Sequence, residues 1–189
     1  MSLRIIAGEF SGRPIEAPSG RVTRPTADRV REAWFSALGS RVRGASVLDL
    51  FAGSGALGLE ALSRGAHHAH FVESDRRALA ALRANVASLG LADRTTVVRR
   101  DAFRFVRSVR KAFDLALADP PYGTGAGPRL LRTFTARPFA SELWLEHAPS
   151  HDLAATAIWT RRYGDTQLSA YRSSIEPGDE PPPRELEAE

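Results

Sequence analysis

The residues with the clearest chemical potential are four consecutive ones, Asp119, Pro120, Pro121 and Tyr122. The exocyclic amine of a nucleobase is a poor nucleophile, and positive charge builds on its nitrogen when it attacks a methyl donor. The carboxylate of Asp119 and the backbone carbonyl of Pro120 can stabilise that charge as it develops. The prolines fix the backbone and supply no competing N–H donor, and Tyr122 can stack on a base swung out of its helix. We predict a catalytic motif here; a Pro-Pro turn capped by an aspartate is the alternative.

A second pattern with chemical potential is Gly53-x-Gly55-x-x-Gly58, with Ser54 inside it. It follows an apolar segment and opens a helical pattern, a position in which glycines let the backbone approach a cofactor at a helix N-terminus. Glu73 stands 20 residues after Gly53, where a carboxylate can accept hydrogen bonds from both hydroxyls of a ribose. Taken alone, the pattern fits a nicotinamide-dependent dehydrogenase almost as well as an enzyme that uses S-adenosylmethionine (AdoMet).

Acidic residues near the ends of three further strands favour AdoMet. Asp49 precedes the glycine loop, where an acid suits a cationic amino-acid moiety better than a pyrophosphate. Asp101, with Ala102 beside it, can accept from an adenine amino group, and Asp119 ends another strand. Each acid alone could instead cap a helix, but ligands of open α/β sheets bind at the carboxyl ends of strands, so we expect one shared crevice. The predicted AdoMet-binding residues are Asp49, Gly53, Ser54, Gly55, Glu73, Asp101, Ala102 and Asp119.

Alternating strand and helix patterns must position these residues, and they predict a parallel, doubly wound α/β sheet of the Rossmann-like kind. A helix with its apolar face on Val30, Trp34 and Leu38 precedes the sheet, with Thr26 as its expected N-cap. Residues 156–174 read as a hairpin that closes one sheet edge antiparallel. The predicted strands cover 46–51, 68–73, 95–100, 113–119 and 142–147, and the predicted helices 56–64, 103–109 and 128–136, with a longer helix between a cap at Ser74 or Asp75 and Gly90.

Residues 4–16 predict a small N-terminal hairpin that recognises a substrate rather than forming part of the core. Arg4 and Arg13 suit phosphates, and Phe10 near the turn can stack on a base. The alternative is an edge strand that merely covers the sheet. The expected organisation is a hairpin extension over residues 1–20, a catalytic domain over 21–175 and a disordered tail over 176–189, which is rich in proline and acid.

The charge distribution points to an anionic partner. The chain has 26 basic residues, of which only Lys111 is a lysine, and six of its 22 acids lie in the tail with one base. Residues 1–175 therefore carry a net charge of about +9, which suits nucleic acid. A GC-rich genome would explain the choice of arginine over lysine but not the excess of positive charge.

Composition excludes several classes of protein. A chain of 189 residues forms one domain, and the lack of cysteine excludes disulfides, thiolate metal sites and cysteine nucleophiles. The five histidines lack metal-binding spacing, and the sulfonium of AdoMet would itself supply the electrophile, so we expect no metal. No apolar run approaches the roughly 18 residues of a membrane span, and the N-terminus lacks a signal peptide. We expect a cytoplasmic monomer that binds no membrane.

Together these segments resemble the RsmD-type bacterial 16S ribosomal RNA guanine-N2 methyltransferases. The resemblance runs from about Arg4 to Tyr171 and rests on RIIAGEFSGR, RPTADRVREAWFSAL, LDLFAGSGALGLEALSRGA, VESD, DPPY and YGDTQLSAY. The second and third segments together are specific. The DPPY segment alone is shared with adenine-N6 and glutamine methyltransferases.

The resemblance implies an AdoMet-dependent methyltransferase fold and methyl transfer to the N2 atom of the guanine at position 966 of 16S rRNA (Escherichia coli numbering), on the assembled 30S subunit, with S-adenosylhomocysteine as product. It places cofactor contacts at Asp49, Gly53, Gly55, Glu73 and Asp101 and the catalytic motif at Asp119 to Tyr122. Arg24, Thr26 and Arg29 match the N-terminal motif of the family, which should lie near the methionine end of AdoMet or the target base.

Three other functions compete with this one. A nicotinamide-dependent reductase would share the glycine loop and Glu73 but would leave the DPPY segment without a role. A non-enzymatic ribosome assembly factor would share the basic body but would not need Asp119. DNA adenine methyltransferases share the motif, but they usually carry an added recognition domain, for which 189 residues leave little room.

Overall fold

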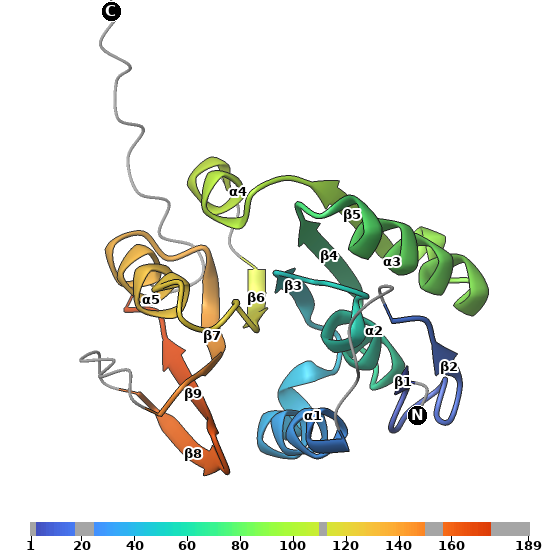
Figure 1. The fold of residues 1–189 in the computed structure, drawn as a ribbon, viewed down its shortest axis with the longest axis horizontal. Helices are drawn as coiled ribbons and strands as arrows, with labels where there is room; N and C mark the ends of the chain where they lie inside the picture. The colour runs from blue at the N-terminus through green and yellow to red at the C-terminus, as the bar shows by residue number, and fades with distance from the viewer. Residues whose placement is uncertain (1–2, 18–24, 110–112, 150–156, 175–189) are drawn as a thin grey trace, which may run out of the picture.

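A computed structural model of the chain describes residues 3–17, 25–109, 113–149 and 157–174. Its centre is a seven-stranded sheet in the order β5-β4-β3-β6-β7-β9-β8 (Figure 1). The strands are β3 (Ser46–Leu50), β4 (His68–Glu73), β5 (Thr95–Arg99), β6 (Phe113–Ala118), β7 (Ala140–His147), β8 (Trp159–Tyr163) and β9 (Thr166–Arg172).

The sheet confirms the predicted Rossmann-like topology. Strands β3 to β7 all run parallel, whereas β9 pairs antiparallel with both β7 and β8. The hairpin between β8 and β9 turns where predicted, at Gly164, whose φ of 60° is accessible mainly to glycine. Strands β4 and β5 lie on one side of β3, and strands β6 and β7 lie on the other. The strand order therefore reverses at β3, which puts the topological switch point beside it.

Helices cover both faces of the sheet, so the central strands are apolar on both sides. Along β3, Val47 packs in the hydrophobic cluster on one face, whereas Leu48 and Leu50 pack in the cluster on the other. No helix in the described part of the chain is both long and apolar enough to span a membrane. The first face carries α1 (Pro25–Leu38), α2 (Ala56–Ser63) and α3 (Arg76–Leu89); the second carries α4 (Ala102–Ser108) and α5 (Ala126–Ala136); the short 3₁₀ segments η1 (Gly39–Val42) and η2 (Ala92–Arg94) complete the described helices.

The helix boundaries confirm one predicted cap and correct another. Asp75 caps α3, because its carboxylate accepts from the amides of Arg77 and Ala78. Thr26 is not an N-cap: α1 already begins at Pro25, whose fixed φ suits the first helical position. Similarly, α5 begins at Ala126, two residues before the predicted start at Pro128.

The N-terminal hairpin forms as predicted but does not stand apart from the core. Strands β1 (Leu3–Arg4) and β2 (Pro14–Ile15) pair antiparallel. Leu3, Ile5 and Ile15 are buried in the same hydrophobic cluster as α1, α2 and α3. The expectation of a hairpin outside the core is therefore wrong, because these three side chains supply apolar surface that the helices cover.

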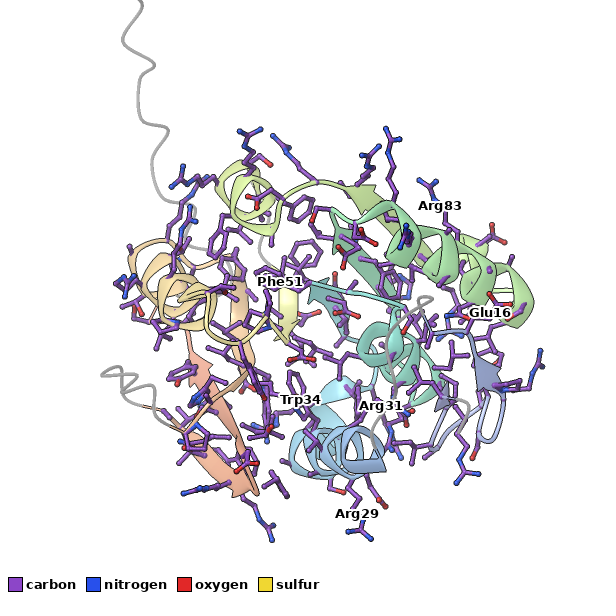
Figure 2. All side chains as sticks on the ribbon, in the orientation of Figure 1. Glu16, Arg29, Arg31, Trp34, Phe51 and Arg83 are labelled. Atoms are coloured by element: carbon purple, nitrogen blue, oxygen red, sulfur yellow. The ribbon has the colours of Figure 1, made fainter. Side chains whose placement is uncertain are left out.

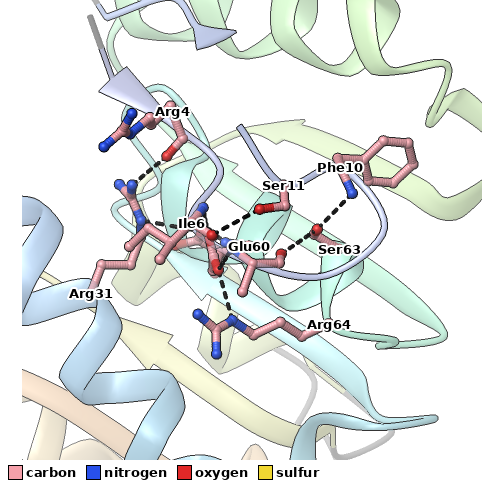
Figure 3. Close-up of polar contacts among 11 residues, drawn as sticks. Arg4, Ile6, Phe10, Ser11, Arg31, Glu60, Ser63 and Arg64 are labelled. Atoms are coloured by element: carbon pink, nitrogen blue, oxygen red, sulfur yellow. Dashed lines mark hydrogen bonds and ion pairs between the residues drawn. The ribbon is translucent and has the colours of Figure 1, made fainter. Parts of the chain in front are cut away.

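A fully buried carboxylate on α2 fastens this hairpin (Figure 3). Glu60 Oε2 accepts from the amide of Ile6 at 2.7 Å, and Oε1 accepts from the amide of Ala7 at 3.0 Å. The guanidinium of Arg64 donates to Oε1 at 2.7 Å, and Arg31 of α1 lies 3.8 Å from Oε2. One charge thus joins the hairpin, α1 and α2.

Two further polar side chains fix the hairpin to the helices. Ser63 donates to the carbonyl of Ala7 at 2.6 Å and accepts from the amide of Phe10 at 3.0 Å. Buried Asn85 of α3 exchanges hydrogen bonds with the backbone of Glu16 and also donates to the carbonyl of Ser54 at 3.0 Å. The end of the hairpin and the glycine loop therefore share one anchor.

Replacing Glu60 should destabilise the whole domain. We expect Glu60→Ala to lower the free energy of unfolding by about 3–5 kcal/mol, because it breaks a buried ion pair and leaves two backbone amides without their acceptor. Denaturant-induced unfolding measures the loss. The matched control is Glu32→Ala on the exposed side of α1, which should change stability by no more than about 0.5 kcal/mol. Equal effects of the two variants would refute the role of Glu60.

Deleting residues 1–16 should abolish cooperative unfolding. The deletion removes the buried side chains of Leu3, Ile5 and Ile15, each worth about 1.5–3 kcal/mol, from a domain whose total stability is on the order of 5–15 kcal/mol. Thermal melting followed by circular dichroism checks this. A cooperative transition near the temperature of the full chain would instead show that the hairpin is separable from the core.

Candidate active site

The predicted acids meet at the carboxyl edge of the parallel strands. Asp49 lies in β3 and Glu73 ends β4, while Asp101 lies two residues after β5 and Asp119 directly follows β6. Because these strands are parallel neighbours, their carboxyl ends share one edge of the sheet. This is the edge at which open α/β sheets bind their ligands, beside the switch point at β3.

The glycine loop has three glycines with different physical roles. A Cβ on Gly55 would lie 2.3 Å from Leu82, and one on Gly58 would lie 2.3 Å from the ring of Phe71, so core packing alone requires both. Gly53 has a φ of +57°, but a Cβ there would meet nothing closer than the carbonyl of Phe51 at 4.0 Å. The loop therefore leaves open space over Gly53, which a ligand can fill.

Glu73 holds this loop as well as lining it. Its Oε2 accepts from the amide of Gly53 at 2.8 Å, and its Oε1 accepts from the amides of Ser74 and Asp75. A carboxylate offers about four acceptor positions, so Oε2 keeps room for one further donor. A ribose that donated both hydroxyls to Glu73 would have to displace one of the backbone amides.

Asp49 is buried in the crevice and accepts from the amide of Gly58 at 2.8 Å. Burial raises the pKa of its carboxyl to about 7; the hydrogen bond from Gly58 opposes this shift, and the charges of Asp119 and Glu73 add to it. The three acids are therefore close enough for their charges to interact. A cationic group bound there would be stabilised by all three.

The other predicted cofactor residues also have structural roles. Asp101 caps α4, because its Oδ1 accepts from the amide of Arg104 at 2.9 Å, and Ala102 is buried in the second cluster. Ser54 is buried, and its carbonyl is held by Asn85. These contacts fix the residues in place, and their contacts with a cofactor stay predictions.

The DPPY motif is an irregular segment after β6, and its last residue, Tyr122, begins the turn over residues 122–125. Asp119 is exposed and Pro120 is buried, so the backbone is fixed while the carboxylate reaches solvent. Tyr122 is 47% exposed. Its hydroxyl donates to Glu146 Oε1 at 2.8 Å and lies 2.7 Å from the hydroxyl of Thr166.

The predicted substrate residues are spread over the N-terminal elements. Arg4 and Arg13 are exposed, and Arg13 donates to the carbonyl of Ser88 at 2.9 Å. Phe10 packs partly against the core. The exposed side chain of Arg29 points away from the body of the protein (Figure 2). The Arg24 prediction and the side-chain prediction for Thr26 lie outside the described residues, and the contacts of all these residues with RNA stay predictions.

Sequence reasoning missed an aromatic cluster beside the crevice. Phe51 has a φ of 60°, unusual for a residue other than glycine, and its ring lies 6.0 Å from that of Phe103 (Figure 2 places Phe51 near the end of β6). The guanidinium of Arg129 stacks 3.9 Å from the Phe103 ring centre. No pattern in the sequence predicts this backbone conformation at Phe51.

Sequence reasoning also missed Glu146 and Thr166, which contact the hydroxyl of Tyr122. Glu146 lies at the carboxyl end of a parallel strand, which is the signal that identified Asp119. That signal was therefore available, although the contact itself requires the antiparallel strand β9 beside β7.

The hydrogen-bonding groups of the crevice fit AdoMet. Asp49, Glu73 and Asp101 are acceptors, and AdoMet presents an ammonium group, ribose hydroxyls and an adenine amino group as donors. Gly53 leaves open space next to them. Within the described ranges, no group of three or more histidines or acids could hold a metal ion.

Comparison with known proteins identifies relatives over most of the chain. A family model described as conserved hypothetical protein 95 matches residues 3–172. The chain is 36% identical over 181 residues to YlbH of Bacillus subtilis, named as a candidate rRNA methyltransferase, covering 90% of this chain and 98% of the relative. It is 42% identical over 123 residues to ribosomal RNA small subunit methyltransferase D of Escherichia coli K12, covering 65% of this chain and 62% of the relative.

Solved structures agree with these relatives. The Escherichia coli protein yhhF, described as a candidate methyltransferase, superposes with a TM-score of 0.81 at 31% identity, covering 92% of this chain and 98% of that one. The 16S rRNA N2 methyltransferase RsmC of Thermus thermophilus, solved with AdoMet and guanosine, gives 0.69 at 22% identity, covering 92% of this chain and 50% of that one. The second likeness shows the fold alone. On the family match and the Bacillus subtilis relative, the chain belongs to the RsmD-type family of rRNA methyltransferases.

Proposed function

We propose that this chain transfers a methyl group from AdoMet to the exocyclic N2 of a guanine in 16S rRNA. The observation that carries the proposal is the position of Asp119, which directly follows β6, the strand that pairs with β3 alongside Asp49. A candidate catalytic acid beside the candidate cofactor acids supports methyl transfer. A reductase that used the glycine loop would not need that arrangement.

The crevice residues would divide the binding of AdoMet between them. Asp49 would face the cationic methionine end, Glu73 a ribose hydroxyl, and Asp101 with Ala102 the adenine. The sulfonium of AdoMet supplies an electrophilic methyl group when bound. Two proteins with a similar fold support AdoMet as the cofactor, since RsmC was solved with AdoMet and SMU.776, a candidate methyltransferase, with S-adenosylhomocysteine.

The DPPY motif would act on the guanine. Its N2 amine gains positive charge as it attacks, and the Asp119 carboxylate with the Pro120 carbonyl would accept its two N–H bonds and stabilise that charge. Buried Pro120 holds the carbonyl in place, and exposed Tyr122 offers a ring face to the base. The motif itself fits other amines, so the choice of guanine rests on the family resemblance.

The finer features of the substrate also rest on that resemblance. They are position 966 and the assembled 30S subunit. A monomeric enzyme in the cytoplasm is the expectation from composition. The basic body supports an RNA partner, since residues 1–175 carry about nine positive charges in excess.

Methyl transfer to unmodified small subunits tests the function directly. With labelled AdoMet, we expect one methyl group on guanine N2 at position 966, found by mapping the modified base. Asp119→Ala should lower turnover by orders of magnitude and AdoMet affinity far less, because the lost acceptor matters mainly as charge develops. Asp114→Ala, at the other end of β6, is the matched control and should remain active. A methylated adenine, or normal turnover by Asp119→Ala, would contradict the proposal.

Replacing Glu73 tests the cofactor site. Glu73→Ala should weaken AdoMet binding by about 1.5–3 kcal/mol, since it removes a charged hydrogen-bond acceptor and releases the amide of Gly53. Isothermal titration calorimetry measures the affinity. Asp75→Ala, in the same turn, removes only the cap of α3 and should cost about 1 kcal/mol of stability but little affinity. Unchanged affinity in Glu73→Ala would move the ribose away from this residue.

A further inference from the structure

Tyr122 combines an exposed ring with an anchored hydroxyl. Together with Ile158 it is one of two large hydrophobic side chains that are exposed in the described part of the chain. It belongs to the turn over residues 122–125, in which Gly123 and Gly125 have φ values of 75° and 70°. A turn with two glycines would not by itself hold an aromatic ring in one orientation.

Two neighbouring strands provide the anchor. Glu146 lies near the carboxyl end of β7, and Thr166 begins β9. These strands pair antiparallel, with Glu146 opposite Leu168, so the sheet fixes the spacing between the two anchoring side chains. The Thr166 hydroxyl also lies 3.4 Å from Glu146 Oε1, which closes a three-membered cluster around the Tyr122 hydroxyl.

The protonation states agree with this cluster. Burial raises the pKa of the Tyr122 phenol, and the negative charges of Glu146 and Asp119 raise it further, so the hydroxyl stays protonated at neutral pH and can donate. Burial also raises the pKa of Glu146, while the hydrogen bonds from Tyr122 and Thr166 lower it. Tyr122 donates to Glu146, and the single proton of the Thr166 hydroxyl can go to Tyr122 or to Glu146, so each hydroxyl proton has an acceptor.

We propose that Glu146 and Thr166 are positioning residues that hold the Tyr122 ring in one orientation beside Asp119, ready to stack on a flipped-out nucleobase. The proposal rests on the proposed function and deepens it, because it assigns a role to two residues outside the DPPY motif. Holding the ring before the RNA arrives lowers the entropy that binding must remove. A phenylalanine would offer a similar ring face but could not be anchored, so the hydroxyl is the part of Tyr122 that this role requires.

The first experiment tests the anchor without any substrate. The chain has three tyrosines, so tyrosine labelled with carbon-13 at Cζ gives three signals, and Tyr122→Phe identifies one of them. Glu146→Ala and Thr166→Val should each shift or broaden the Tyr122 signal. Thr160→Val, in the neighbouring strand β8, should leave it unchanged. An unmoved signal in both anchor variants would overturn the proposal.

The second experiment measures methyl transfer to small subunits in a double-mutant cycle. Glu146→Ala and Tyr122→Phe should each raise KM for the subunits about three- to tenfold, the range expected for ordering one side chain on binding. For Glu146→Ala, the kcat and the AdoMet affinity should change little. Glu146→Gln keeps an acceptor oxygen and should restore most of the lost affinity. In the Tyr122→Phe background, Glu146→Ala should have no further effect.

The outcomes separate the two proposals. A full effect of Glu146→Ala in the Tyr122→Phe background would show that Glu146 acts without the hydroxyl, and this would overturn the positioning role. If the unmodified enzyme transfers no methyl group to small subunits, the proposed function fails, and the tyrosine signals alone then decide whether the anchor exists.

Discussion

The buried carboxylate of Glu60 constrains how three segments of the chain pack. Removing an ionised group from water costs several kcal/mol, and the cost is offset only when its acceptor positions are filled. Here the hairpin supplies two amides and α1 and α2 each supply a guanidinium, from Arg31 and Arg64. All three elements must therefore be in place together. Because Glu60 lies on the same helix as Gly58, whose amide Asp49 holds, the packing of the hairpin is continuous with the wall of the crevice.

The acids of the crevice are themselves part of the structure they line. Asp49 holds the amide of Gly58, Glu73 that of Gly53, and Asp101 that of Arg104. Capping and ligand binding are therefore compatible roles for these residues. A carboxylate that is already fixed by a backbone amide keeps its orientation when a ligand arrives, so little reorganisation opposes binding. The acids that define the site are also the acids that shape its loops.

The sequence predicts the sheet well because its signals are local. Short apolar runs mark the parallel strands, and acids at the ends of several of them mark the edge where ligands bind. The core role of the hairpin was not predictable in this way, since Leu3 and Ile15 belong to strands of two residues, too short to show periodicity, and are buried in a cluster formed with α1, α2 and α3. The anchor of Tyr122 depends on Thr166, 44 residues away, which only the pairing of β9 with β7 brings near. Contacts between distant segments leave no local pattern from which they could be predicted.

The charges around the crevice suggest how an acidic site can serve a polyanionic substrate. Asp49, Glu73, Asp119 and Glu146 line or adjoin it, and together they repel phosphate. Exposed arginines follow the same strand ends: the first two residues of α3, Arg100 after β5, Arg104 in α4 and Arg129 in α5. Phosphates are attracted to guanidinium groups, whereas the cationic methionine end of AdoMet is attracted to carboxylates. RNA that followed the arginines would keep its phosphates at the rim, and only an uncharged, splayed-out base would then enter the acidic crevice.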